Sequence, residues 1–324
     1  MIEFGYVLSS EEHGPAGLVT LAAAGERAGV DYLSISDHFH PWVGAQGHSP
    51  FVWSVLGAIA QETERVRVGV GVTCPIQRIH PAVIAQAAAT TSLLFDGRFF
   101  LGLGTGEALN EHILGDRWPT PETRREMLIE AIGIMRELWG GDTVDHHGDH
   151  YTVENARLFD HPSDPIPLIL SAFGPNAAEE LASLADGFWN TSPDADLVRT
   201  FTDAGGSGPR YAEITVCWSA DADDARSTVH EHWPNSALPG QLAQDLPTWT
   251  HFEQATSVLS IDQTTEDVAC GPDLEPFVEQ VQTYLDAGYD HLHFHQIGHD
   301  QDGFLEFWKN ELEPTVRDLR PTTD

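Results

Sequence analysis

Short apolar runs alternate with longer amphipathic segments through the first two thirds of the chain and again near its end. Apolar runs of this length predict strands that are buried on both faces of a parallel sheet. The runs lie at residues 2–7, 32–36, 66–72, 99–103, 166–172, 187–191, 214–218 and 291–295. Between them, residues 14–28, 121–139 and 273–287 carry apolar positions at helical spacing and predict helices.

One joint recurs near both ends of the chain. Residues 27–33 and 286–292 share a helix end at Ala-Gly, a turn that contains Asp and the entry to a strand, and residues 185–188 are a looser copy. A repeated joint of this kind indicates a cyclic array of βα units. We therefore predict an α/β fold in which residues 1–324 form a single (β/α)8 TIM-barrel domain, with a doubly wound sheet as the alternative. The alternation lapses between Cys217 and Cys270, which places an insertion in a late βα loop at about residues 219–265.

The charge balance is strongly acidic. The 324 residues include 50 Asp and Glu against 16 Lys and Arg, which gives a formal net charge of −34, and Lys309 is the only lysine. A basic surface for nucleic acid or for a membrane has almost no residues to form from, so we exclude both partners. Adaptation to high salt in a halophilic source explains this acidity better than an acidic docking surface does.

Cysteine spacing and the absence of targeting patterns predict a cytoplasmic protein. Cys74, Cys217 and Cys270 are odd in number and far apart in the sequence, which argues against a disulfide framework or a structural zinc site. The opening residues carry no signal-peptide pattern, and no apolar stretch is long enough to cross a bilayer.

A polar segment, Ser-Asp-His-Phe-His-Pro-Trp at 36–42, follows the second predicted strand. The carboxyl ends of barrel strands face the active site, so Asp37, His38 and Trp42 are expected to face a substrate. A carboxylate beside an imidazole, whose pKa lies near neutrality, is what general-base chemistry requires. Ordinary polar loop residues are the alternative interpretation.

His38 and His40 also form an H-x-H pair, and a second group of histidines lies at 291–299. In metal-dependent hydrolase barrels such a pair follows the first strand, whereas here it follows the second. Spacing alone is a weak metal signal. We therefore predict no metal site and keep a zinc hydrolase as a minor alternative.

A glycine-rich loop, Gly-Leu-Gly-Thr-Gly-Glu-Ala-Leu-Asn-Glu at 102–111, follows the Phe-rich strand. Alternate glycines allow a ligand to approach the backbone closely, and Glu107 lies beside them. The loop lacks the glycine spacing and the position of a Rossmann dinucleotide site. It predicts a ligand loop of another kind.

Six ordered motifs resemble the F420-dependent glucose-6-phosphate dehydrogenase group of the bacterial luciferase-like superfamily. They cover nearly the whole chain, and the match is weakest at 200–265. The motifs lie at residues 36–42, 79–87, 104–111, 148–151, 185–188 and 298–301. The resemblance implies a small-molecule alcohol or sugar as substrate, coenzyme F420 as hydride acceptor and a homodimer.

The resemblance also implies roles for individual residues. Asp37 would contact the deazaflavin ring of F420, His38 would take the hydroxyl proton of the substrate, and Glu107 would act as an acid toward the reduced ring. Trp42 would cover the reacting centre, and Glu11, in the loop after the first strand, would be a further active-site carboxylate.

Further coenzyme contacts follow from the same resemblance. Gly71 and Val72 match a bulge that contains a non-prolyl cis peptide bond behind the ring. The remaining contacts would come from Thr105, Gly106, Asn110, Ser171, Ala172, Phe173 and Gly174.

The chain departs from this group at the substrate end. Sugar-phosphate enzymes of the group hold the phosphate with two lysines and an arginine, whereas this chain has one lysine near its C-terminus and aligns Glu266 and Asp267 near the expected arginine. Carboxylates there would repel a phosphate dianion. An unphosphorylated sugar or a simple alcohol is therefore the better prediction, unless Arg199, Arg210 or Arg226 substitutes for the missing cations.

Three functional hypotheses remain at this point. The first is F420-dependent dehydrogenation of an alcohol or sugar carbon. The second keeps the barrel and makes it an FMN-dependent luciferase-like monooxygenase or an F420H2-dependent reductase. The third is an F420-binding protein without catalysis, which the set of Asp37, His38, Trp42 and Glu107 argues against.

Overall fold

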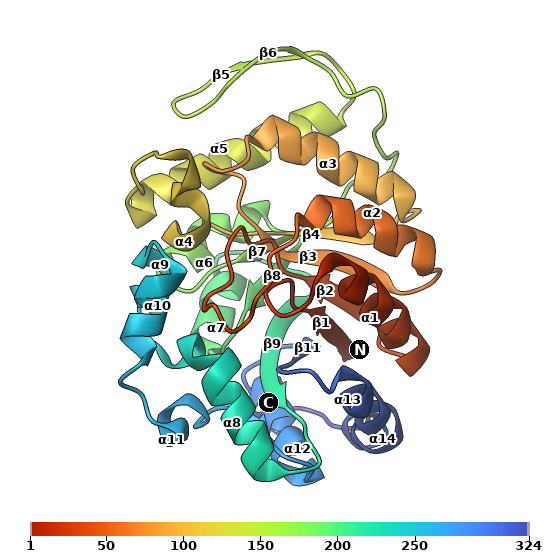
Figure 1. Cartoon of the computed structure of the whole chain (residues 1–324). Coiled ribbons are helices and arrows are strands. Elements are labelled where there is room, and N and C mark those ends of the chain that lie inside the picture. Colours follow the sequence, from red (N-terminus) through yellow and green to blue (C-terminus); the bar gives the residue numbers. More distant parts are fainter. Residues whose placement is uncertain (1, 323–324) are drawn as a thin grey trace.

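Eight parallel strands close into a barrel in the computed structural model, which describes residues 2–322 (Figure 1). Each strand pairs with the next one in the barrel, and the ring is closed where β8 pairs with β9 and where β11 pairs with β1. In order round the barrel the strands are β1 (Glu3–Leu8), β2 (Tyr32–Ile35), β3 (Arg67–Thr73), β4 (Phe99–Leu103), β7 (Leu168–Ser171), β8 (Gly187–Asn190), β9 (Arg210–Cys217) and β11 (His291–Gln296).

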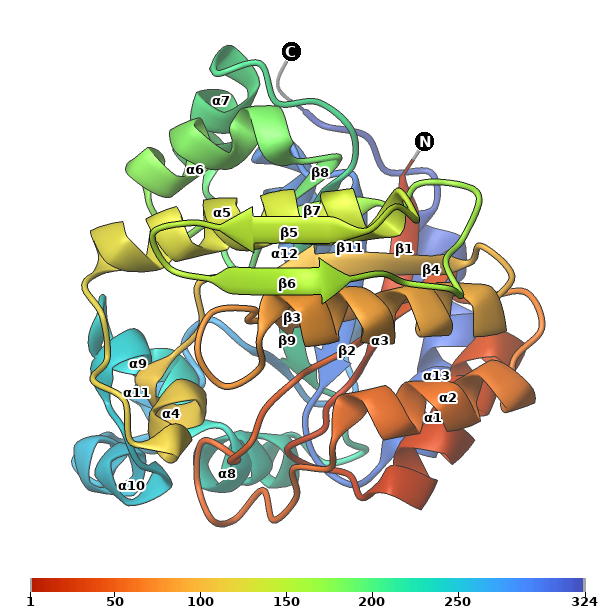
Figure 2. The same cartoon turned by 90° about the horizontal axis from the view of Figure 1, so that it is seen from above.

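Helices surround the barrel and cover its outer face (Figures 1 and 2). Apolar side chains between the sheet and these helices form the main core, which includes Phe4, Leu33 and Leu101. The helices that follow barrel strands or precede them are α1 (Pro15–Ala28), α2 (Val52–Glu62), α3 (Pro81–Leu94), α5 (Pro121–Trp139), α6 (Pro175–Leu181), α7 (Ala195–Asp203), α8 (Ala222–His232), α12 (Leu274–Asp286) and α13 (Gln301–Phe307).

A second, smaller core fills the lower interior of the barrel. It consists of the buried rings of Tyr32, Phe100, Trp189 and Tyr211 together with Ile169. Glycines on neighbouring strands leave room for these rings, because a side chain at Gly5 would collide with the ring of Tyr32. Aromatic rings thus fill this part of the interior, and in (β/α)8 barrels the site lies at the other end, where the strands reach their carboxyl ends.

Several smaller elements lie outside this pattern. A hairpin of β5 (Val144–His147) and β6 (Thr152–Ala156) lies across α5 and α3 (Figure 2). Residues 108–114 form α4 (Ala108–Glu111) and a 3-10 turn, and the chain ends with a π-helix and α14 (Glu313–Val316). The expected insertion contains α8, a 3-10 turn, α9 (Leu242–Asp245), α10 (Trp249–Thr256) and α11 (Ile261–Thr264).

The barrel prediction is confirmed, and so is the repeated joint. Gly29 and Gly288 both adopt the left-handed conformation, with φ of 85° and 98°, directly before the turns that enter β2 and β11. The helix at 121–139 has the predicted bounds, and the side chain of its N-cap Thr120 accepts the amide of Thr123. The largest difference in strand position is at β9, which begins at Arg210, four residues before the apolar run at 214–218.

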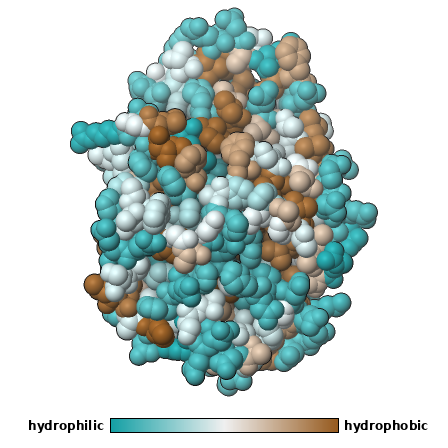
Figure 3. Space-filling view, in the orientation of Figure 1, coloured by the Kyte–Doolittle hydropathy of each residue, from teal (hydrophilic) through white to brown (hydrophobic). Residues whose placement is uncertain are grey.

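The described residues also bear on the cysteines, the surface and the membrane. Cys217 and Cys270, far apart in the sequence, lie in register on β9 and the short β10 (Ala269–Cys270), and both are free thiols. On the face shown in Figure 3, hydrophilic side chains dominate and hydrophobic ones form separate patches. Among residues 2–322, no helix combines the length and the apolarity that a bilayer crossing needs.

Candidate active site

The predicted site residues gather at the carboxyl ends of neighbouring strands. Glu11 follows β1, His38 follows β2, Val72 lies next to the last residue of β3, Glu107 follows β4, and Ser171 ends β7. Because these strands are neighbours in the barrel, the residues lie along one continuous stretch of its rim.

His38 lies between a carboxylate and an indole. Its Nδ1 is 3.2 Å from Oε1 of Glu11, although the two atoms lack the alignment of a hydrogen bond. The other oxygen of Glu11 accepts hydrogen bonds from Ser36 at 2.7 Å and Ser9 at 3.1 Å, which hold the carboxylate in place. The ring of Trp42 packs edge to face against the imidazole at 5.0 Å. His38 is only 11% exposed, and within residues 2–322 no hydrogen bond engages its Nε2, so this nitrogen is available to a ligand.

Asp37 belongs to a buried charge network that the sequence did not reveal. One of its carboxylate oxygens accepts a hydrogen bond from Arg78 at 2.9 Å, and the other accepts one from Thr73. Arg78 also binds Glu111, through its backbone amide at 2.7 Å and its side chain at 3.4 Å. Burial opposes the charge of Arg78, but the carboxylates of Asp37 and Glu111 raise its pKa overall, whereas burial raises the pKa of Glu111.

Asn110 connects the segment after β2 with the glycine-rich loop. Its side-chain oxygen accepts the backbone amides of Phe39 at 2.9 Å and His40 at 3.2 Å. Its amide nitrogen donates to Oε2 of Glu107 at 3.3 Å. Asn110 therefore sets the position of Glu107 relative to the chain that carries His38.

The ends of β3, β4 and β7, with the loops that follow them, form what we call the glycine arc: residues 71–72, 102–107 and 171–174. The peptide bond between Gly71 and Val72 is cis, as the resemblance implies. A side chain at Gly104 would place its Cβ 2.8 Å from Val72, so β3 and β4 approach more closely here than other residues allow. At the β7 end Ala172 is buried, whereas Phe173 is 51% exposed.

A second polar group, which we call the histidine arc, lies on the other side of Glu11: Glu12, Glu213, His293 and His295. His295 Nε2 lies 2.9 Å from Oε2 of Glu12, whose other oxygen accepts the amide of Gly298 at 2.9 Å. Glu213 on β9 lies 3.6 Å from Nδ1 of His295 and 3.8 Å from Nε2 of His293. The sequence indicated the histidines as a possible metal group, but gave no sign that Glu12 and Glu213 would join them.

The two histidines of the H-x-H pair do not converge on a common point. His38 is directed to Glu11, whereas Nδ1 of His40 lies 3.0 Å from the carbonyl oxygen of Leu109. Within residues 2–322, no group of three or more His, Cys, Asp or Glu side chains is arranged to hold a metal ion. The geometry gives no support to the zinc alternative.

Comparison with known proteins identifies the family of this chain. The family model described as luciferase-like monooxygenase matches residues 2–291. This chain belongs to that family. The curated relatives of this luciferase-like chain include proteins named F420-dependent glucose-6-phosphate dehydrogenase, from Mycolicibacterium gilvum (36% identical over 333 residues, 98% of this chain and 99% of the relative) and from Rhodococcus erythropolis (37% over 333 residues, 98% of each).

Solved structures give the same result for the fold. An F420-dependent secondary alcohol dehydrogenase, solved in complex with an F420–acetone adduct, matches with a TM-score of 0.90 at 27% identity and covers 98% of this chain and 99% of its own. The F420-dependent tetrahydromethanopterin reductase from Methanopyrus kandleri, at 20% identity, has a TM-score of 0.79 and covers 98% of this chain and 99% of its own. The second likeness concerns the fold alone.

Aromatic side chains from the segment 219–265 cover the rim of the barrel where these site residues lie. Trp42 packs at 5.1 Å against Phe252 of α10, and Trp233 packs at 4.3 Å against the imidazole of His295. Val43 and Leu109 join Phe252 in a small apolar cluster. This part of the cover is therefore apolar.

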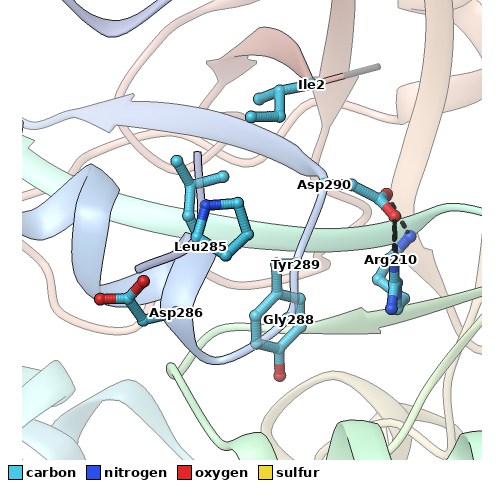
Figure 4. Close-up of a pocket in the computed structure, with 8 residues that line it drawn as sticks. Ile2, Arg210, Leu285, Asp286, Gly288, Tyr289 and Asp290 are labelled. Carbon is cyan, nitrogen blue, oxygen red and sulfur yellow. Dashed lines mark hydrogen bonds and ion pairs between the residues drawn. The ribbon is translucent and has the colours of Figure 1, made fainter. Parts of the chain in front are cut away.

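The three arginines that could replace the missing cations are occupied elsewhere. Arg210 starts β9 at the amino end of the barrel, where it binds Asp290 at 2.6 Å beside a hollow of about 350 Å³ (Figure 4). Arg226 on α8 pairs with Asp262, and Arg199 on α7 pairs with Asp196. Arg210 therefore lies at the opposite end of the barrel from His38, and each of the three already has a carboxylate partner.

Proposed function

We propose that this chain is an F420-dependent dehydrogenase that transfers a hydride from an alcohol or sugar carbon to the coenzyme. The observation that carries the proposal is the His38 imidazole, whose free Nε2 lies on the same rim as the glycine arc while Glu11 and Trp42 hold the ring. Relatives that are named F420-dependent, and span the chain almost completely, support it.

The residues of the glycine arc fit a flat coenzyme. Gly104 and Gly106 let the loop backbone lie close to β3, because a Cβ would collide with Val72 at Gly104 and with Cys74 at Gly106, and Gly106 has φ of 70°, which side chains rarely adopt. Val72 would lie behind the ring, and Thr105, Asn110 and residues 171–174 would contact its edges and tail. When bound, the deazaflavin supplies the hydride acceptor, which no side chain can provide.

The protein's own residues would provide proton transfer and orientation. His38 would accept the hydroxyl proton at Nε2, since Nδ1 faces the carboxylate of Glu11. Trp42 would exclude water above the reacting carbon, and Glu107, held by Asn110, would supply the proton on the coenzyme side. Asp37, with both oxygens bound to Arg78 and Thr73, would support the ring from a fixed position.

We further propose that the substrate carries no phosphate. Phosphate sites need cations or several amide donors, and Arg199, Arg210 and Arg226 are each paired with a carboxylate. Glu266 and Asp267 lie in an exposed turn before β10 and add negative charge. The apolar cover around Trp42 suits a small, uncharged alcohol.

The test is anaerobic mixing of the protein with oxidised F420 and a panel of hydroxyl compounds that contains 2-propanol, glucose and glucose 6-phosphate. We expect the coenzyme absorbance to fall with an uncharged alcohol and to fall least with the phosphate ester. His38→Ala should lower kcat roughly 10²- to 10⁴-fold with little change in coenzyme affinity, because it removes the base alone. His40→Ala is the matched control and should keep most of the activity. A chain that reduces F420 with no member of a broad panel would contradict the proposal.

We also propose adaptation to high salt, on the basis of the net charge of −34. Screening by salt removes most of the repulsion between surface carboxylates. The unfolding temperature should therefore rise steadily between about 0.1 M and about 2 M KCl, where the Debye length is a few ångströms or less. An unfolding temperature that does not change with salt would contradict this proposal.

A further inference from the structure

The histidine arc has no role in the proposed reaction, yet it brings two carboxyl groups and two imidazoles together. Glu12, Glu213 and His295 lie in an unbroken series, with Glu213 to His295 at 3.6 Å and His295 to Glu12 at 2.9 Å. Two imidazole nitrogens here, Nε2 of His293 and Nδ1 of His295, are buried without a hydrogen-bond partner within residues 2–322. A buried polar group without a hydrogen-bond partner lowers the stability of the fold, so its presence in a native structure calls for an explanation.

The hydrogen bonds indicate the protonation state of one end of the series. Both oxygens of Glu12 accept hydrogen bonds, from Gly298 and from His295, and these bonds lower its pKa despite the opposing effect of burial. His295 therefore donates from Nε2. Burial disfavours its charged form, but the hydrogen bond to Glu12 and the charges of Glu12 and Glu213 raise its pKa. Its Nδ1 faces Glu213 at 3.6 Å.

Glu213 is the second carboxyl group beside His295, 3.6 Å from its Nδ1. Burial raises its pKa, while His295 and His38 act in the opposite sense and Glu11 reinforces it. Burial and the charge of Glu213 both raise the pKa of Tyr284 on α12. Nε2 of His293 faces the second carboxyl oxygen of Glu213, and Nδ1 of His293 lies 3.1 Å from the hydroxyl of Tyr32. The side chain is 17% exposed, so a water molecule can reach its carboxyl group. Glu213 is thus a carboxyl group that faces two imidazoles and is partly exposed to solvent.

Two consecutive residues connect the two imidazoles. Glu11 holds His38, and Glu12 holds His295, so the backbone between them fixes one pair relative to the other. The next residue, His13, is partly exposed, and His299 beyond the end of β11 is exposed. Because Glu12 is buried and His13 is partly exposed, His13 is the end of the series that solvent reaches.

Each turnover of an alcohol dehydrogenase leaves one proton on the base, and this proton must leave before the next substrate reacts. We propose that Glu213, His295 and Glu12 form a proton path from the His38–Glu11 pair to solvent at His13. One proton enters from His38 and one leaves to water, and no electron moves. The step between Glu213 and His295 needs a small movement or one bridging water, because 3.6 Å is too long for a hydrogen bond. This inference rests on the proposed function.

The first test needs neither coenzyme nor substrate. The imidazole of His295 is titrated by NMR in protein with labelled histidine, and the signal is assigned with His295→Gln. Glu213→Gln should reduce the proton affinity of His295 about threefold or more, a shift of about half a pKa unit, because a negative charge is removed. Glu213→Asp keeps the charge and should retain most of the affinity. Thr215→Val, two residues along the same strand, removes a polar group without charge and is the control.

The second test separates hydride transfer from the return of the base. With F420 and an active alcohol, Glu213→Gln should lower steady-state turnover about tenfold while the single-turnover hydride step changes less than about twofold, and added imidazole buffer should restore turnover. Glu213→Asp should retain turnover.

Three results would overturn the path. One is a His295 titration that Glu213→Gln does not move. Another is unchanged turnover in Glu213→Gln. The third is a parallel loss of both rates that buffer does not restore, since that would indicate a structural role. If the wild-type chain reduces no coenzyme, both the proposed function and the path are overturned, whatever the NMR result. If the wild-type chain is active and the turnover of Glu213→Gln equals that of the wild type, the path alone is overturned.

Discussion

The two arcs of the barrel rim contain opposite kinds of chemistry. In the glycine arc, glycines allow neighbouring strands to approach closely. In the network beside it, the charge of Arg78 is matched by the carboxylates of Asp37 and Glu111. In the histidine arc, Nε2 of His293 and Nδ1 of His295 are buried but not hydrogen-bonded. A matched, rigid surface suits the binding of a flat ligand, whereas unmatched titratable groups suit proton transfer. The difference suggests that binding and proton release are divided between the two sides of His38.

The largest expected effect breaks the matched side. Arg78→Ala leaves two carboxylates buried without their cation, Asp37 and Glu111, each 1% exposed. Loss of one partner of a buried ion pair costs about 3–5 kcal/mol, so the free energy of unfolding should fall by that amount. The control is Arg125→Gln, whose partner Glu180 is 44% exposed and which should cost less than about 1 kcal/mol. Equal losses for the two variants, measured by urea denaturation, would contradict the matched network.

An intermediate effect tests the close backbone approach. Gly106→Ala adds a methyl group to a residue with φ of 70° and directs it at Cys74, so coenzyme affinity should fall about tenfold or more. Gly115→Ala, with φ of 88° and no atom within 4 Å of the new Cβ, carries similar backbone strain outside the arc. Binding titrations of both variants with F420 separate the two contributions. If Gly106→Ala binds as tightly as Gly115→Ala, the arc does not hold the coenzyme.

The smallest effect concerns the unmatched side and depends on pH. Burial raises the pKa of Glu213 above its ordinary value of 4.5, so above pH 4.5 the unfolded chain loses this proton before the folded one does. The folded protein therefore loses stability as pH rises through this range, and Glu213→Gln, which has no proton to lose, does not. The difference in Tm between the variant and the wild type should move in favour of the variant by a few degrees at most between pH 4.5 and neutrality. A constant difference across this range would show that Glu213 ionises normally.

The sequence predicts the glycine arc and the residues around His38 far better than the charged networks on either side of them, for a physical reason. His38, Trp42 and Glu107 lie in short contiguous segments at strand ends, so local pattern and family resemblance were enough to indicate them. The barrel itself followed from the repeated joints at Gly29 and Gly288.

Residues that depend on distant parts of the chain were missed. Glu213 lies in the first half of β9, which begins with the charged and mixed sequence Arg-Tyr-Ala-Glu rather than with an apolar run. Its partners lie on another strand, and Glu12 meets His295 across 283 positions in the chain. Arg78 likewise lies in a loop, and it contacts Asp37 and Glu111 only when β2, β3 and α4 come together in the folded chain. Contacts of this kind exist only in the closed barrel, so no local pattern indicates them.

The most direct measurement follows the hydrogen on the carbinol carbon of the substrate. The protein is mixed without oxygen with oxidised F420 and 2-propanol, or another active alcohol, that carries deuterium on that carbon, and the reduced coenzyme is analysed by mass spectrometry. If the chain is an F420-dependent dehydrogenase, the reduced coenzyme gains the deuterium, and His38→Ala forms it far more slowly. Reduced coenzyme that contains only hydrogen from solvent, or no reduced coenzyme with any alcohol tested, would contradict the proposed function.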